Sequence, residues 1–163
     1  MWRGATATCR CVAINFEDSI CRGSGSDVTL ARILGIDHVQ LAIPAGGEAR
    51  ARAFYVDLLG LREVPKPPAL AARGGCWFAG DDVAIHLGVE EPFRAATKAH
   101  VALVVEDLDG VRERLTGAGV ETASDDAGID VCRFYAFDPF GNRLELIDAD
   151  DRGFSARTVG ASG

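Results

Sequence analysis

The sequence predicts an α+β domain made of two consecutive βαβββ units, and two observations support this fold class. Short segments that alternate large apolar residues with small or polar ones, as half-buried strands do, recur through residues 36–148. Two segments with the apolar spacing of an amphipathic helix interrupt them, each after one strand and before three more. The two halves of this region therefore share one order of elements.

The first unit is expected to begin with a strand at 36–43 and to continue into a helix near 47–59. The apolar residues of the helical segment recur at i, i+3, i+4 and i+7, and Gly60 is expected to end the helix. These apolar positions are Ala51, Phe54, Tyr55 and Leu58, and the three strands that follow are expected at about 61–65, 74–79 and 82–89.

The second unit repeats this order from a strand at 99–105. Asp107 is expected to cap a helix near 108–118, and Gly119 is expected to end it. The apolar stripe of this helix is Leu108, Val111, Leu115 and Ala118, and three strands are expected at about 120–123, 131–137 and 142–148. Residues 138–142 are typical of a turn that sets the register of the last strand.

The two ends of the chain lack such patterns. Residues 1–32 show no sustained period and end in a Gly-Ser run, so we expect a disordered or loosely attached N-terminal extension. The domain itself is expected at 33–149, and a flexible tail at 150–163.

The composition narrows the possible partners. A chain of 163 residues with 48% hydrophobic and 25% charged residues suits one soluble globular domain. The net charge of −7 disfavours nucleic acids and anionic membranes, because phosphate binding requires clustered Lys and Arg. This charge is more consistent with a small-molecule or protein partner. The five cysteines show no disulfide framework, so we expect a reducing, cytoplasmic setting.

All three histidines lie in predicted strands, on the face that carries small or polar residues. His38 is in the first strand, His86 in the fourth and His100 in the fifth, while Glu145 takes the equivalent place in the last. Each unit thus supplies one such residue from its first strand and one from its last. Burying three imidazoles and a carboxylate together without a cation would be costly, so the set predicts one metal site.

The plainer explanation of each residue, taken alone, is a hydrogen-bonded structural histidine or a surface carboxylate. Taken together, three imidazoles and one carboxylate suit a divalent transition metal (Fe, Mn, Ni, Co or Zn) better than Mg²⁺ or Ca²⁺, which prefer oxygen ligands. The residues leave open whether His86 is a direct ligand or a neighbouring group.

The chain resembles the vicinal oxygen chelate superfamily over roughly residues 34–148. Four segments carry the resemblance in the appropriate order: 35–43, 53–61, 99–107 and 138–147. This superfamily contains glyoxalase I, extradiol dioxygenases, methylmalonyl-CoA epimerase, and the fosfomycin and bleomycin resistance proteins. The resemblance implies a half-open, eight-stranded mixed sheet that cups a metal, with the helices on the outside.

The resemblance also implies roles for the four residues. His38, His100 and Glu145 match the metal ligands of the superfamily. His86 occupies the position where glyoxalase I has a glutamate and where the extradiol dioxygenases and fosfomycin-modifying enzymes have no ligand.

The main expectation from the resemblance is a metal-dependent lyase or isomerase of the glyoxalase type. Its small substrate would chelate the metal through two adjacent oxygens, with Glu145 and His86 as the catalytic residues. One alternative is an Fe(II)-dependent extradiol-type dioxygenase, in which His86 is an acid–base group rather than a ligand. Another is a drug-resistance protein, either a thiol transferase or a bleomycin-type binder.

A homodimer is also implied by the resemblance. In many relatives the modules swap between subunits, so that each metal site joins ligands from two chains. Here His38 and His86 of one chain would face His100 and Glu145 of the other.

Overall fold

The computed structural model describes residues 32–124, 128 and 131–151. The chain divides into two units, Met1–Leu34 and Gly35–Gly163, and the architecture below belongs to the second. The predicted N-terminal extension and C-terminal tail fall almost entirely outside the described residues. Within the described part of the chain, no helix combines the length and apolar character that crossing a membrane requires.

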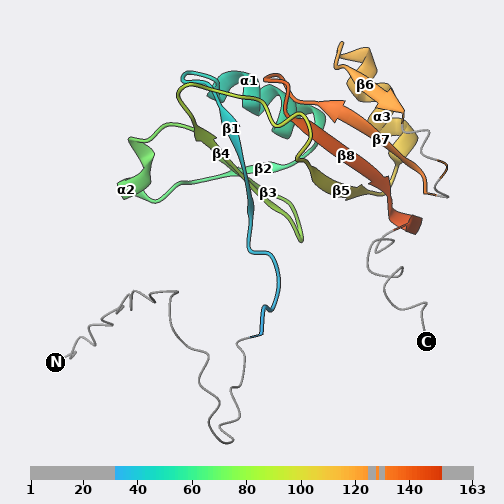
Figure 1. The fold of residues 1–163 in the computed structure, drawn as a ribbon, viewed down its shortest axis with the longest axis horizontal. Coiled ribbons are helices and arrows are strands. Elements are labelled where there is room, and N and C mark those ends of the chain that lie inside the picture. Colours follow the sequence, from blue (N-terminus) through green and yellow to red (C-terminus); the bar gives the residue numbers. More distant parts are fainter. Residues whose placement is uncertain (1–31, 125–127, 129–130, 152–163) are drawn as a thin grey trace, which may run out of the picture. The chain divides into compact units, whose positions relative to one another are not determined.

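The first module contains four strands and one long helical segment (Figure 1). The strands pair in the order β1-β4-β3-β2, with β1 parallel to β4 and the other neighbours antiparallel. The elements are β1 (Val39–Ile43), α1 (Glu48–Arg52), the π-helical η1 (Ala53–Leu58), β2 (Arg62–Val64), α2 (Pro68–Ala71), β3 (Trp77–Ala79) and β4 (Ala84–Val89).

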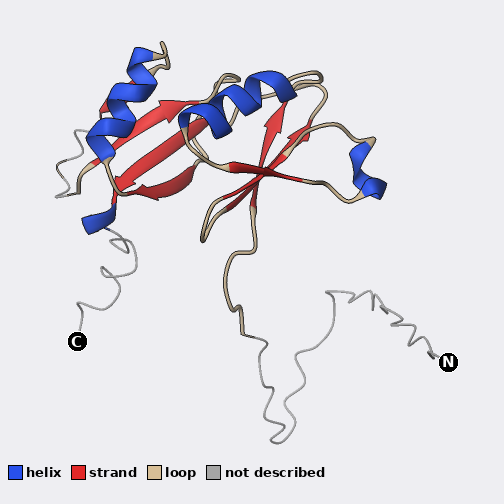
Figure 2. Cartoon of the chain, turned by 180° about the vertical axis from the view of Figure 1, so that it is seen from behind, coloured by secondary structure: helices blue, strands red, loops and turns tan. Residues whose placement is uncertain are grey.

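The second module repeats this arrangement. Its strands pair in the order β5-β8-β7-β6, again with the first strand parallel to the last. The elements are β5 (Val101–Val105), α3 (Leu108–Gly117), β6 (Thr122–Ser124), β7 (Arg133–Phe137), β8 (Arg143–Asp148) and the 3₁₀-helical η2 (Ala149–Asp151). The eight strands thus form two mixed four-stranded sheets accompanied by helices (Figure 2), and the predicted α+β fold with two βαβββ modules is confirmed.

Alternation along the strands separates a core face from a polar face, as predicted. Leu41 and Ile43 of β1 are buried, while Gln40 before them is exposed and Ala42 between them is half-buried. Ile85 and Leu87 of β4 are buried on either side of the half-buried His86. The buried strand residues form one core with the apolar sides of the helices; it includes Phe54, Tyr55, Phe78, Leu115, Phe134, Leu144 and Leu146.

The helical segment after β1 is nearly continuous from Glu48 to Leu58. It widens into a π-helix, in which the Leu59 N–H donates to the Phe54 carbonyl at 3.0 Å. Gly60 then adopts a φ of +75°, a left-handed conformation that favours glycine, so the predicted end of this helix is confirmed. In the second module, the Asp107 carboxylate accepts from the Gly110 N–H, which confirms the predicted cap of α3.

Two details differ from the sequence prediction. The strand ladders begin at Val39 and Val101, so His38 and His100 lie immediately before their strands rather than within them. The short helices α2 and η2 were not predicted, because four or three residues are too few to show a helical period. Pro68 opens α2, a position where the missing N–H of proline costs nothing.

A buried polar cluster joins the turn between β7 and β8 to the first module. The Asn142 side chain is fully buried; its amide donates to the Ala42 carbonyl and to Asp138 Oδ2, and its Oδ1 accepts from the Ala96 N–H, each at 2.9 Å. The Tyr55 hydroxyl donates to Asp138 Oδ2 at 3.0 Å. Burial, followed by the Asp138 charge, raises the pKa of Tyr55 well above its usual range, so this hydroxyl remains a donor.

We expect Asn142→Ala to lower the free energy of unfolding by about 3 kcal/mol, because the partly buried Ala42 carbonyl and Ala96 N–H and the buried Asp138 carboxylate each lose a partner. Tyr55→Phe is the matched comparison and should cost only about 1 kcal/mol, because Asp138 keeps its other donors. Urea denaturation of both variants measures the difference. Equal losses, or an Asn142→Ala protein as stable as the wild type, would show that this cluster does not hold the modules together.

Candidate metal centre

The four predicted ligands lie in two pairs, one in each module. His38 lies beside His86, and His100 lies beside Glu145. Among the described residues, no group of three or more His, Cys, Asp or Glu side chains could hold a metal ion within the single chain. The structure therefore presents two half-sets of the predicted site.

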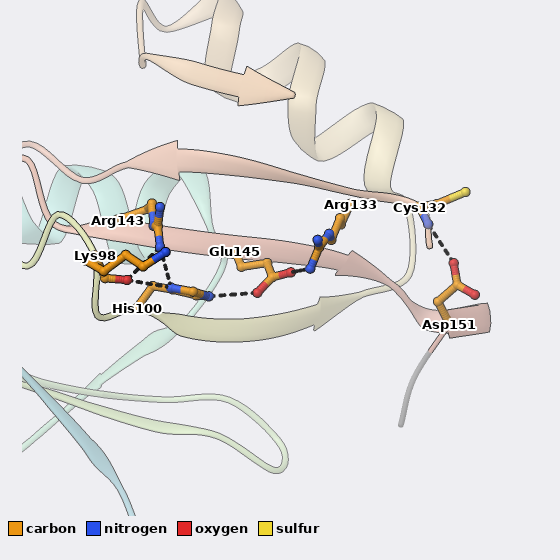
Figure 3. A network of polar contacts seen from close by, with 7 residues as sticks. All are labelled: Lys98, His100, Cys132, Arg133, Arg143, Glu145 and Asp151. Carbon is orange, nitrogen blue, oxygen red and sulfur yellow. Dashed lines mark hydrogen bonds and ion pairs between the residues drawn. The ribbon is translucent and has the colours of Figure 1, made fainter. Parts of the chain in front are cut away.

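Glu145 is the most constrained member of the second-module pair. It lies in the middle of β8 and is only 5% exposed, so its charge needs partners. Its Oε2 lies 2.9 Å from His100 Nε2, and its Oε1 accepts from Arg133 Nη1 of β7 at 2.6 Å (Figure 3). Each oxygen of the buried carboxylate is therefore held in place.

The spacing of this pair fits a shared metal. Two ligand atoms that lie at right angles about 2.1 Å from a metal ion are about 3.0 Å apart. The observed separation of 2.9 Å between His100 Nε2 and Glu145 Oε2 agrees with that value. Arg133 would continue to hold the outer carboxylate oxygen, which is how ligating carboxylates are usually oriented.

The other ring nitrogen of His100 has two competing neighbours. His100 Nδ1 lies 3.0 Å from the Lys98 carbonyl oxygen and 2.9 Å from Arg143 Nη2, which itself donates to that carbonyl at 2.6 Å (Figure 3). A guanidinium can only donate, so the contact with Arg143 requires a bare Nδ1, whereas Lys98 requires a protonated one. A metal on Nε2 would favour the tautomer in which Nδ1–H donates to Lys98.

The first-module pair belongs to a column of three rings. The rings of His38 and His86 stack with centroids 4.0 Å apart and planes inclined by 23°. Trp77, the cross-strand partner of His86, stacks against it at 3.9 Å and 6°. Burial, and then the proximity of His38, lower the pKa of His86. The lowered pKa favours the neutral imidazole, which can coordinate a metal or accept a proton.

This stacked arrangement limits what the two histidines can bind. An imidazole holds a metal in its own plane, about 2 Å from the nitrogen. Two ring planes inclined by 23°, with centroids 4.0 Å apart, meet only roughly 9 Å from the rings, far beyond that bond length. His38 and His86 therefore cannot bind one ion together unless one of the rings turns.

The contacts that Trp77, Arg133 and Arg143 make with the candidate ligands were not predicted. Arg133 lies on the same face of β7 as Tyr135, the register partner of Glu145. That register is not readable from the sequence, so no sequence signal marked Arg133 as a partner of Glu145. A cavity of about 690 Å³ beside β5 includes Val104 and Glu106 in its lining but none of the four predicted ligands.

Comparisons with known proteins agree with the fold. The family model of the Glyoxalase/Bleomycin resistance protein/Dioxygenase superfamily matches residues 35–146. The crystal structure of a glyoxalase family protein from Bacillus anthracis is 48% identical and has a TM-score of 0.69, covering 73% of this chain and 98% of that chain. No curated protein matches the sequence.

More distant structures show the fold alone. The fosfomycin resistance protein FosX from Listeria monocytogenes is 18% identical, with a TM-score of 0.58 over 72% of this chain and 93% of that chain. The antibiotic binding protein TnmS3 from Streptomyces sp. CB03234 is 21% identical, with a TM-score of 0.55 over 72% of this chain and 98% of that chain. The family match spans more than half of the sequence. The chain therefore belongs to the Glyoxalase/Bleomycin resistance protein/Dioxygenase superfamily.

Proposed function

We propose that this protein is a metal-dependent enzyme of the glyoxalase type, a lyase or isomerase acting on a small substrate that chelates the metal through two adjacent oxygens. The observation that supports the proposal most strongly is the His100–Glu145 pair, with its buried carboxylate and the 2.9 Å separation of its ligand atoms. His38 would complete the ligand set, with His86 either as a fourth ligand or as a group beside the metal, and such a set suits Fe, Mn, Ni, Co or Zn.

The protein's own residues would carry the proton transfer. Glu145 Oε2 is the carboxylate oxygen next to His100, while Arg133 keeps Oε1 engaged, so Oε2 would serve both as metal ligand and as the atom that accepts and returns a substrate proton. The neutral ring of His86 is a second group able to accept a proton. When bound, the metal would supply a Lewis acid that stabilises negative charge on the substrate oxygens.

We further propose that the site forms between two copies of the chain. A swapped homodimer would bring His38 and His86 of one chain to His100 and Glu145 of the other, which accounts for two half-sets in one chain. Val104 supports this, because it is 45% exposed and lies on the strand face that carries Glu145.

We also propose a cytoplasmic location, with which the free thiols of Cys76 and Cys132 are consistent.

An Fe(II)-dependent extradiol-type dioxygenase is the second candidate, and the stacked rings favour it. If only His38 of that pair binds the metal, His38, His100 and Glu145 form a two-histidine, one-carboxylate triad suited to Fe²⁺ and O₂.

A substrate panel separates the reaction classes: oxygen uptake with catechols indicates the dioxygenase, and turnover of hemithioacetals indicates the glyoxalase type. Thiol transfer to fosfomycin would indicate a resistance enzyme.

The protein purified without added metal should contain a transition metal, and its removal should lower the melting temperature, because an ion that binds only the folded state stabilises it.

Glu145→Gln should weaken metal binding by about 100-fold or more, since a ligand is lost. Glu113→Gln, on the exposed side of α3, is the matched control and should bind metal normally. Elemental analysis and thermal unfolding report both effects. Metal-free protein whose stability does not respond to added metal would contradict the proposed function.

The shared site can be tested by combining two defective chains. His38→Ala and Glu145→Gln homodimers should each lack an intact site. Heterodimers isolated with two different affinity tags should regain about half of the wild-type metal content, because one of the two swapped sites then has all its ligands. Heterodimers without metal, or a monomer that holds metal in sedimentation analysis, would exclude swapping.

A further inference from the structure

The ring column formed by Trp77, His86 and His38 has one fixed end and one end that can move. Trp77 and His86 face each other across the β3–β4 ladder, and their rings are almost parallel, at 6° and 3.9 Å. His86 lies inside a six-residue strand and is half-buried, so its backbone and its ring are both held. This end of the column belongs to the sheet.

His38 forms the movable end. It precedes β1, its side chain is 40% exposed, and its Nδ1 lies 2.6 Å from the carboxylate of Asp37, which is 96% exposed. Among the described residues, a rotation about the side-chain bonds of His38 would break the stack with His86 and the hydrogen bond with the exposed Asp37. Turning His86 would instead break the closer and more parallel stack with Trp77.

We propose that Trp77 is a positioning residue that keeps His86 out of the metal's coordination shell, so that His38 alone of this pair binds the metal. The inference rests on the proposed function, since it concerns how the same site is completed. It follows from the geometry of the rings, because the two imidazoles cannot bind one ion while they are stacked. Rotation of His38 breaks weaker contacts than rotation of His86, so His38 is the ring that turns toward the metal. His86 then stays beside the metal, but neither of its ring nitrogens coordinates the ion.

Proton NMR of the Co²⁺-loaded protein tests this directly. Each histidine bound to paramagnetic Co²⁺ gives one strongly shifted, exchangeable ring N–H signal. The wild-type protein should show two such signals, from His38 and His100, and His86→Ala should retain both. Three signals in the wild type, with one lost in His86→Ala, would overturn the inference.

The role of Trp77 is tested with two variants. Trp77→Leu keeps apolar bulk but removes the flat ring, so His86 becomes free to turn and a third shifted signal should appear. Trp77→Phe keeps a ring against His86 and should show two signals, as the wild type does. Two signals in Trp77→Leu would overturn the positioning role, and the wild-type count remains decisive if that variant does not fold.

The two proposals fail in different ways. If Co²⁺ produces no shifted histidine signals at all, the proposed metal-dependent function is wrong, and the inference falls with it. If Co²⁺ binds and three histidines are shifted in the wild type, the metal site stands and only the inference about Trp77 and His86 is wrong.

Discussion

A carboxylate buried in the middle of a sheet must keep a strong partner on each oxygen, and Glu145 imposes that requirement on the second module. Its two oxygens are engaged by His100, immediately before β5, and by Arg133 of β7, and these two strands flank β8. Removing one partner would leave a buried charge uncompensated, which is far more destabilising than the pair is stabilising. The same constraint fixes Glu145 Oε2 at the distance from His100 Nε2 that two neighbouring metal ligands require.

The turn before β8 holds this strand in place and connects it to the first module. Asp138 and Asn142 are both buried, and their hydrogen bonds reach Tyr55 in the long helix and Ala42 at the end of β1. The position of β8, and with it Glu145, is therefore coupled to the strand that follows His38. A polar cluster of this kind specifies one arrangement of the two modules, because each buried group has its partner only there.

The sequence was sufficient for the features that depend on periodicity. A period of two separates Leu41 and Ile43 from Gln40, and the helical spacing and Asp107 locate α3. It was insufficient for features that depend on strand register and side-chain rotamers. The contact of Arg133 with Glu145 and the stack of Trp77 on His86 arise from pairings between strands that no local pattern encodes. The same reason explains why four residues on equivalent strands suggested one site, while the single chain separates them into two pairs.

We propose that one metal ion joins the two half-sets. A crystal structure of the metal-loaded protein, with anomalous diffraction data collected at the absorption edge of the metal, would locate this ion. We expect one anomalous peak per chain, bonded to His100 Nε2 and Glu145 Oε2 and to a ring nitrogen of His38 from the partner copy. A peak bound elsewhere, or two half-sets that remain apart in every assembly in the crystal while the ion is present, would contradict it.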